Sequence, residues 1–575
     1  MVNLLGFSVD NLDLPWFLAM TRLGFVALTL LGALMAARAS NRRRIGWIVL
    51  GIGMAGHTLA WFATMFPLSN PYGANGSMDR ENHLGWANVV ALGFSPLRTF
   101  QVNHLHFEPL WPLLTAMAAG FNVDRVALVF QWEPLVVGLA LLLSVRFAWV
   151  RGLWPSGRSE TEAAFAALGA LLLTSAPGDF SGPFRNPWAL MVLLKPNHAL
   201  GLVLVPLAAL AISRAGTWKS RLFAGFALQL VGWAFVIHMA LFVAGLAVFV
   251  ALSWISRRTD RVKDLMDAGT AVGVNLLIVS PYLVMLVVAY PFLQGSDLYR
   301  LSPFSERPME GPFRLGALFL LSAFGAWRAY RQESRLGRIL ASQWLAAHIV
   351  WQAFPVLGLF GQAREQDEAF YWCRFWTGLF AGVGLFQAVH LALTRLRSLK
   401  PDGAQGLVGL SAALSLTLLL PSLLPAWWDP SEMDQYFVAS RKPLPDWISE
   451  PNRFIRTSTP PEAVFAGDRS YARWIAAYGA RRVLLANSLN LPGDSRRRSE
   501  VESAILRQGD GTLVAEGRAR YGIEYFLVTS NPMEQAPDLS LDQLKLHPHL
   551  ETVYDRQFES TRVVIFRIVP KSERR

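Results

Sequence analysis

The sequence predicts a polytopic α-helical membrane protein of about twelve spans, followed by a small α/β domain outside the membrane. Three observations support this fold class. Hydrophobic residues make up 53% of the 575-residue chain and the mean hydropathy is +0.32, which is too apolar for a soluble globular protein. Long apolar runs alternate with short segments rich in Arg and Lys. Beyond Trp428 the long apolar runs stop, and short strand and helix patterns replace them.

Six basic segments separate the apolar runs. Short loops rich in Lys and Arg stay on the cytoplasmic side of a membrane, so an even number of crossings must lie between successive basic segments. Their charged residues are Arg38, Arg42, Arg43 and Arg44; Arg151 and Arg158; Arg214, Lys219 and Arg221; Arg257, Arg258, Arg261 and Lys263; Arg328, Arg331, Arg335 and Arg338; and Arg395, Arg397 and Lys400.

Helices of about 20 residues satisfy this requirement. They fit at residues 14–36, 45–66, 126–150, 163–176, 189–213, 222–235, 238–254, 268–292, 313–330, 339–360, 371–394 and 406–427. Both termini then lie outside, and residues 67–125 form one long external loop within a membrane domain of residues 1–427.

Two stretches test the topology. The apolar run from Leu222 to Ile255 is too long for one span, so we expect a tight pair of short helices that turns near His238. A crossing between Pro109 and Gly120 would place Arg151 outside. We therefore expect an external amphipathic or re-entrant segment there.

The positive charge follows the topology. The net charge is +12, but residues 428–575 carry 21 Lys or Arg against 20 Asp or Glu. The basic excess therefore belongs to the membrane part, and we expect membrane lipids and no nucleic acid as partners. The first 13 residues contain Asp10 and Asp13 and no basic segment, so we expect no cleavable signal peptide. The single cysteine, Cys373, excludes an intramolecular disulfide.

Residues 428–575 predict a small α/β domain. Strands alternate with helices, and the last two strands are close enough to pair as a hairpin. Strand patterns occur at 463–466, 482–486, 525–529, 552–554 and 562–569, and helical patterns at 473–479, 501–508 and 513–521. No glycine-rich phosphate loop is present, so nucleotide binding has no local support.

The external loop is the most plausible place for chemistry. It is longer than a connection requires and carries carboxylates and imidazoles at the rim of a membrane domain. Asp79 and Glu81 are candidate acid–base groups, and Arg98, His104 and His106 are candidates for binding phosphate or sugar. The alternative is a solvated loop whose charges have no function.

A metal is a second hypothesis for the same loop. His104, His106 and Glu108 alternate along the chain, so their side chains would face one side of an extended segment. No third strong ligand motif accompanies them elsewhere, so we expect no transition metal.

The layout resembles the GT-C superfamily of membrane glycosyltransferases, in its bacterial form. The shared features are many spans, a long first external loop with an acidic motif, and an external α/β domain after the last span. Segments 522–528 and 563–568 also resemble the C-terminal domains of such bacterial proteins. In that superfamily the acidic motif is often an adjacent pair, whereas here Arg80 separates Asp79 from Glu81, and an extra helix precedes the loop.

The resemblance implies transfer of a sugar from a polyprenyl-phosphate donor to a glycan, lipid or protein acceptor at the outer face of the bacterial inner membrane. A carboxylate would deprotonate the acceptor hydroxyl, and cations would stabilise the departing phosphate. Asp79 is the expected base, with Glu81 as the second candidate. The sequence leaves open whether a divalent cation takes part.

Cations at the outer ends of spans are candidates for the phosphate, because an unpaired charge there is costly. These are Lys195, His198, Arg364 and Arg374. An ion pair with Glu368 is the alternative for Arg374, and snorkelling to the interface is the alternative for Lys195. His238 is expected to be a packed polar residue.

Two other functions stay open. The protein could be a non-catalytic membrane subunit whose external domain docks a partner. A transporter is less favoured, because no span shows the paired charges or broken halves expected of many transporters.

Overall fold

The computed structural model describes residues 78–104, 108–152, 159–174, 196–289, 317–332, 334–358, 366–395, 444–486, 494–506, 511–530, 541–559 and 561–569, with Ser411 and scattered positions before residue 57. The chain divides into two compact units. Unit 1 comprises Met1–Leu68, Pro134–Val279 and Tyr299–Val438. Unit 2 comprises Ser69–Glu133, Ser280–Leu298 and Ala439–Arg575.

Unit 1 is helical, and its helices coincide with predicted spans. They are α5 (Val123–Gly152, which begins in unit 2), α6 (Ser159–Thr174), α8 (Pro196–Ser213), α9 (Trp218–Ala234), α10 (Val236–Ile255), α11 (Arg261–Ala289), α13 (Ala317–Arg331), α14 (Arg335–Gly358) and α15 (Gln366–Arg395). The spans expected at 14–36, 45–66 and 406–427, and the domain boundary at 427–428, lie mostly or wholly outside the described residues.

The count of about twelve spans is not confirmed. Among the described residues, three helical segments are long and apolar enough to cross a membrane: Pro196–Ser213, Val236–Ile255 and Trp372–Arg395. A fourth candidate is the bent pair formed by α4 (Leu110–Ala118) and Val123–Glu133, whose axes differ by 113°. A bend of this size occurs in a broken span or in a re-entrant segment. A re-entrant segment is one of the two forms expected for residues 109–120.

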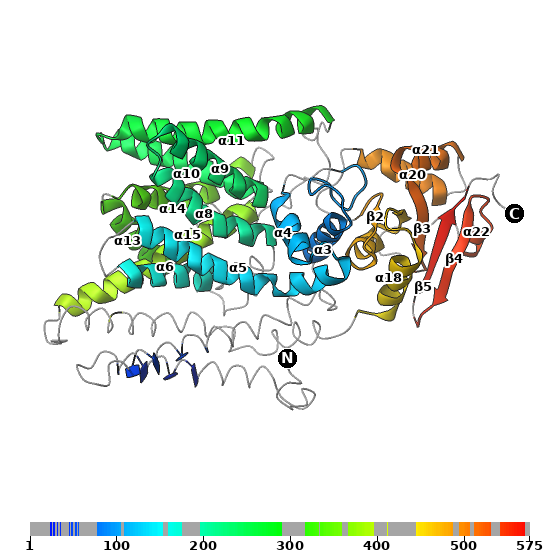
Figure 1. Ribbon diagram of the computed structural model, residues 1–575, viewed down its shortest axis with the longest axis horizontal. Helices are drawn as coiled ribbons and strands as arrows, with labels where there is room; N and C mark the ends of the chain where they lie inside the picture. Colours follow the sequence, from blue (N-terminus) through cyan, green and yellow to red (C-terminus); the bar gives the residue numbers. More distant parts are fainter. Residues whose placement is uncertain are drawn as a thin grey trace. The chain divides into compact units, whose positions relative to one another are not determined.

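Close helix packing in unit 1 depends on glycines of α15. A Cβ on Gly382 would lie 2.2 Å from the carbonyl oxygen of Phe165 in α6, and one on Gly384 would lie 2.0 Å from that of Leu321 in α13. Small residues at these positions let neighbouring backbones approach, as is usual in membrane helix bundles. Figure 1 shows α6, α13, α14 and α15 running alongside one another.

The expected pair of helices within residues 222–255 is present. The break lies at Phe235, whose extended backbone (φ −157°, ψ 111°) separates α9 from α10. Arg221 near the start of α9 and Ser253 near the end of α10 both contact the first turns of α11. The two helices therefore form an antiparallel hairpin.

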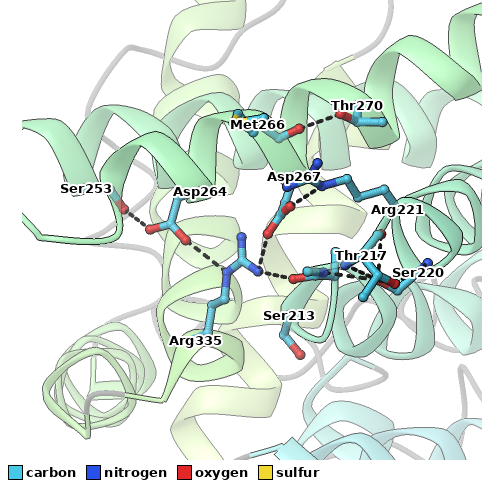
Figure 2. Close-up of polar contacts among 12 residues, drawn as sticks. Ser213, Thr217, Ser220, Arg221, Ser253, Asp264, Met266, Asp267, Thr270 and Arg335 are labelled. Atoms are coloured by element: carbon cyan, nitrogen blue, oxygen red, sulfur yellow. Dashed lines mark hydrogen bonds and ion pairs between the residues drawn. The ribbon is translucent and has the colours of Figure 1, made fainter.

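Four of the six basic segments meet at one end of unit 1. The Arg214 side chain donates to the carbonyl of Arg151 at 2.9 Å, Arg335 donates to the carbonyl of Ala215 at 2.9 Å, and the hydroxyls of Ser256 and Tyr330 lie 3.0 Å apart. Figure 2 shows the centre of this region, where Arg335 lies between Asp264 and Asp267. The shared location agrees with the requirement that the basic segments occupy one side of the membrane.

Unit 2 contains a five-stranded mixed sheet with strand order β2-β1-β3-β5-β4. Its strands are β1 (Val464–Gly467), β2 (Arg482–Val483), β3 (Ile523–Thr529), β4 (Leu550–Gln557) and β5 (Arg562–Ile568). Strands β1, β2 and β3 are parallel, and β4 and β5 form the expected antiparallel hairpin. The sheet confirms the predicted α/β composition, and Figure 1 shows β3, β5 and β4 side by side.

Helices surround the sheet in unit 2. They are α18 (Asp446–Ser458), α19 (Arg469–Trp474), the π-helix η7 (Ile475–Gly479), α20 (Ser495–Leu506), α21 (Gly511–Tyr521) and α22 (Leu541–Lys545). The core consists of Val102, Val464, Ala466, Leu484, Leu485, Val501, Val514, Tyr521, Ile523, Phe526, Val528, Leu544, Leu550, Val564, Phe566 and Ile568. Because Val102 comes from the predicted external loop, that loop contributes to the core of the α/β domain.

The loop is more ordered than the sequence analysis expected. It contains α3 (Met78–Ala91) and α4, and it also extends the sheet. The N–H of Val102 donates to the carbonyl of Val483 at 2.9 Å, and the N–H of Val483 donates to the carbonyl of Phe100 at 2.9 Å. These bonds cover the edge strand β2, which would otherwise expose unpaired backbone groups.

Candidate functional site

Helix α3 carries both candidate carboxylates, and Glu81 is buried rather than solvated. Its side chain is 5% exposed. The indole Nε1–H of Trp474 donates to Glu81 Oε1 at 2.8 Å, and Arg473 Nε lies 2.8 Å from Glu81 Oε2. Both partners belong to α19, nearly 400 residues along the chain. The alternative of a loop carboxylate exposed to water therefore does not describe Glu81.

The same face of α3 contacts the π-helix. Asn88 Nδ2 donates to the carbonyl oxygens of Ala476 at 3.1 Å and Ala477 at 2.8 Å. Between Glu81 and Asn88, a Cβ on Gly85 would lie 2.9 Å from the Cβ of Ala476. Helix α3 is thus held against the α/β domain along its length.

The opposite side of α3 packs on aromatic residues. The His83 ring makes edge contacts with Trp86 and with Trp111 of α4, at centroid distances of 5.4 and 4.8 Å. Trp111 is fully buried. This cluster fixes α4 relative to α3, so the first two helices of the external loop form one packed layer.

Arg98 and His104 lie in the turn that follows α3. The Thr99 hydroxyl is 3.1 Å from His104 Nδ1, and His104 is buried. Arg98 is exposed, and Arg482 stacks over the Phe94 ring at 4.3 Å. Burial, together with the charge of Arg98, lowers the pKa of Arg482 below its usual range. This turn therefore concentrates positive charge beside the edge strand.

The structure gives no metal site at the described part of this turn. Glu108 is buried at 4% exposure, and among the described residues no three His, Cys, Asp or Glu side chains converge as a metal requires. His106 lies outside the described residues. The three-residue pattern proposed from the sequence is therefore not tested by the residues that the structure describes.

One of the predicted phosphate-binding residues, His198, lies in a buried cluster of unit 1, and a second, Arg374, is close in sequence to another member of it. His198 near the start of α8 contacts Phe235 at 3.8 Å and His238 at 5.5 Å between ring centroids. His238 contacts Trp372 of α15 at 5.1 Å, and Arg374 follows two residues later, 4% exposed. Both ring nitrogens of His238 are buried without a hydrogen-bond partner among the described residues. His238 is a packed residue, as expected.

A second polar cluster in unit 1 escaped the sequence analysis. Cys373 Sγ lies 3.4 Å from His348 Nδ1, and Thr377 Oγ1 lies 3.1 Å from His348 Nε2. His348 is on α14 and the other two residues are on α15, so no short motif joins them. The residues are buried together, and spacing along one helix could have suggested only the pair Cys373 and Thr377.

The other predicted site residues are described less fully. Asp79 is the second residue of α3, and its position is known through the backbone of that helix. Lys195 and Arg364 lie outside the described residues. Among the site residues predicted from the sequence, the structure therefore brings His198 close to the segment that contains Arg374, and it sets Glu81 against the α/β domain.

Two solved proteins are similar in structure to this chain. ArnT from Cupriavidus metallidurans, crystallised in the apo state and bound to undecaprenyl phosphate, aligns with a TM-score of 0.50 at 15% sequence identity, covering 91% of this chain and 98% of that chain. The oligosaccharyltransferase AglB from Archaeoglobus fulgidus, in complex with an inhibitory peptide and a dolichol-phosphate, aligns with a TM-score of 0.45 at 13% identity, covering 87% of this chain and 79% of that chain. No protein-family model and no curated protein matches the sequence.

ArnT has the fold of the GT-C membrane glycosyltransferases. The likeness to ArnT spans both the helical and the α/β parts. The chain therefore has the GT-C membrane fold, and the resemblance stated from the sequence is confirmed at the level of the fold.

Proposed function

We propose that this protein is a membrane glycosyltransferase that moves a sugar from a polyprenyl-phosphate donor to an acceptor outside the cytoplasm. The observation that carries the proposal is the alignment with ArnT bound to undecaprenyl phosphate, which covers 91% of this chain and 98% of that chain. A non-catalytic membrane subunit whose external domain docks a partner is the alternative, and an assay of sugar transfer distinguishes the two. Here both parts of a GT-C enzyme are present.

Asp79 is the proposed general base. Its carboxylate takes the proton of the acceptor hydroxyl as the hydroxyl oxygen forms a bond to the anomeric carbon of the sugar. The bond between that carbon and the phosphate oxygen breaks, and the electron pair leaves with polyprenyl phosphate. Glu81 is the weaker candidate, because it already accepts from Trp474 and pairs with Arg473.

Cations at the outer ends of the helices would stabilise the departing phosphate. We assign this task to Lys195, His198, Arg364 and Arg374, with Arg98, His104 and His106 as further candidates for binding phosphate or sugar. The buried contacts from His198 through His238 to Trp372, two residues before Arg374, support the assignment, because they bring His198 close to the segment that contains Arg374.

The basic segments give the proposed orientation. Their common location at one end of unit 1 favours a cytoplasmic placement of that end. From the sequence topology we propose that residues 67–125 and 428–575 face outward at the inner membrane of a bacterium, where a lipid-linked sugar meets its acceptor.

The first prediction concerns Asp79. Asp79→Asn should lower transfer from a radiolabelled polyprenyl-phosphate sugar to a cell-envelope fraction by about 10²–10⁴-fold, because a general base contributes about that much to a rate. Glu81→Gln should have the smaller effect. The matched control is Asp124→Asn, which alters an exposed carboxylate of unit 2 that pairs with Arg456. Undiminished transfer by the Asp79→Asn protein would exclude Asp79 as the base.

A further inference from the structure

We propose that Trp474 and Asn88 are positioning residues, which hold α3 and therefore Asp79 in register with the α/β domain. The inference rests on the proposed function, because it concerns the placement of the proposed base. It assigns the C-terminal domain a part in catalysis that neither the sequence motifs nor the fold comparison contains.

The contacts lie along one face of α3. Glu81, Gly85 and Asn88 are separated by four and three residues, which is the spacing of neighbours on one side of a helix. Each of them meets the segment from Arg473 to Ala477: Glu81 meets Trp474 and Arg473, Gly85 meets Ala476, and Asn88 meets the carbonyls of Ala476 and Ala477. These contacts form one continuous interface between α3 and the segment from Arg473 to Ala477.

The π-helix explains why an amide side chain is needed at position 88. A π-helix bonds each carbonyl to the N–H five residues later, and such turns are rare and frequently occur at functional sites. In η7 the carbonyls of Ala476 and Ala477 both accept from the Asn88 amide. The segment ends at Ala480, which has a left-handed backbone with φ 52°. Without the Asn88 amide, two buried carbonyls would lose these partners.

The hydrogen bond from Trp474 to Glu81 holds the N-terminal end of α3. Glu81 lies about half a helical turn beyond Asp79, so any shift of the first turn of α3 moves both residues. Glu81 and Arg473 are 6% and 14% exposed at their side chains, and a buried ion pair of this kind contributes little to stability compared with apolar packing. Its geometric constraint on α3 is the larger effect.

The chain after α3 is tied to the same domain at a second place. Residues 100–102 pair with Val483, and the side-chain oxygen of Gln101 accepts from the N–H of Ala486 at 3.3 Å. Because α3 is held both along its length and beyond its C-terminus, its first turn has a defined place. A misplacement of about 1 Å in a catalytic group can cost about 10²-fold in rate.

The test compares two variants with one control. Trp474→Phe removes the indole N–H and keeps the ring packing, and Asn88→Ala removes the amide donor. Trp447→Phe is the control, since Trp447 of α18 packs against the ring of Trp474 at 5.2 Å within the same aromatic cluster. We expect Trp474→Phe and Asn88→Ala to lower kcat by about 10–10²-fold, with KM for the donor changed less than about threefold. The control should keep kcat within about threefold of the parent protein.

A double-mutant cycle separates positioning from general destabilisation. If Trp474 acts through Asp79, Trp474→Phe should cause little further loss in a protein that already carries Asp79→Asn. An equal loss with and without Asp79→Asn would overturn the positioning role. If Asp79→Asn has no effect by itself, the assigned base and hence the positioning role are both wrong.

Hydrogen exchange of the full-length protein supplies a readout that does not depend on transfer. Both variants should speed exchange at the α3 amides and leave the amides of β3 and β5 unchanged, because those strands are hydrogen-bonded within the sheet. Unchanged protection of α3 in both variants would overturn the inference even if transfer is observed. In a different outcome, the parent protein transfers no sugar while both variants still lose protection of α3. That result would contradict the proposed function but support the contacts between α3 and residues 473–477.

Discussion

Glu502 is a buried carboxylate of unit 2 whose ionisation is opposed by burial. It lies on α20 at 4% exposure, and Arg469 Nε donates to its Oε2 at 3.1 Å. Burial raises the pKa of Glu502 to about 7, although the charge of Arg469 acts in the opposite direction. The folded domain therefore holds a proton that the unfolded chain releases near pH 4.5.

We predict that unit 2 loses stability as the pH rises from 5 to 8. When folding raises the pKa of a carboxyl group, protonation favours the folded state. This stabilisation is complete at a pH below the pKa in the unfolded chain, and it is lost as the pH rises through the pKa in the folded domain. The difference between the two pKa values corresponds to about 3 kcal/mol at most. The measurement is the thermal unfolding of a protein in which residues 69–122 are joined to 439–575 by a flexible linker.

The control for this prediction is Glu502→Gln, which stays neutral and keeps an oxygen for Arg469. This variant should unfold at nearly the same temperature at pH 5 and pH 8, and above the parent protein at pH 8. A parallel decline in both proteins would show that another group causes the pH dependence.

At the scale of residues, the sequence indicated which groups carry charge but not which groups meet. Asp79 and Glu81 were selected because they lie, with imidazoles, in a long external loop at the rim of a membrane domain. Nothing near Glu81 in the sequence could indicate Trp474 or Arg473, since these contacts depend on the folded α/β domain. The cluster of His348 with Cys373 escaped for the same reason, because its members lie on two helices.

At the scale of elements, α11 is attached to its neighbours by polar contacts at its first turns. Asp264 and Asp267 are fully buried there, and Arg335 of α14 lies 2.9 Å from one and 2.7 Å from the other. Arg221 of α9 reaches Asp267 at 2.6 Å, and Ser253 of α10 donates to Asp264 at 2.9 Å. Figure 2 shows the two carboxylates on either side of the Arg335 guanidinium. One side chain thus joins α14 to α11.

We predict that Arg335→Met destabilises the protein by about 3–5 kcal/mol, because it leaves two buried carboxylates without their shared cation. The measurement is the temperature at which the purified protein in detergent loses its monodisperse size-exclusion peak. Lys263→Met, which alters an exposed cation at the start of α11, should change that temperature little.

A second variant distinguishes the effect of the lost positive charge from the effect of altered side-chain packing. Adding Asp264→Asn to Arg335→Met removes the carboxylate that keeps only the more distant Arg338, at 3.7 Å, and should recover part of the lost stability, whereas Asp267 keeps Arg221 at 2.6 Å. If Arg335→Met alone unfolds at the temperature of the parent protein, the ion pairs do not hold α11.

Hydropathy and basic segments located the helices of unit 1 well, because length and apolar composition are local properties. The pair α9 and α10 was expected from the length of its apolar run, and the break was misplaced by only three residues, from His238 to Phe235. Helix α3 was missed, whereas the π-helix lies within the helical pattern expected at 473–479. Helix α3 has little amphipathic pattern of its own, and its packing partners lie far along the chain.

At the scale of the whole molecule, the long loop and the C-terminal residues form one unit rather than a connection and an independent domain. Val102 enters the core of the sheet, and residues 100–102 cover β2. The sequence predicted an α/β domain from strand and helix alternation. It could not predict this union, because a single backbone pairing with an edge strand carries no hydrophobic pattern.

The central claim is that the chain transfers a sugar from a lipid phosphate, and the purified protein in lipid nanodiscs tests it most directly. The substrates are undecaprenyl-phosphate sugars labelled in both sugar and phosphate, supplied with an envelope fraction as the source of acceptor. We predict that free undecaprenyl phosphate is released in a one-to-one ratio with sugar joined to acceptor, because the reaction breaks one bond for each bond that it forms. No release from any of several donor sugars, by a protein that is folded and monodisperse, would contradict the claim and favour a membrane subunit that docks a partner.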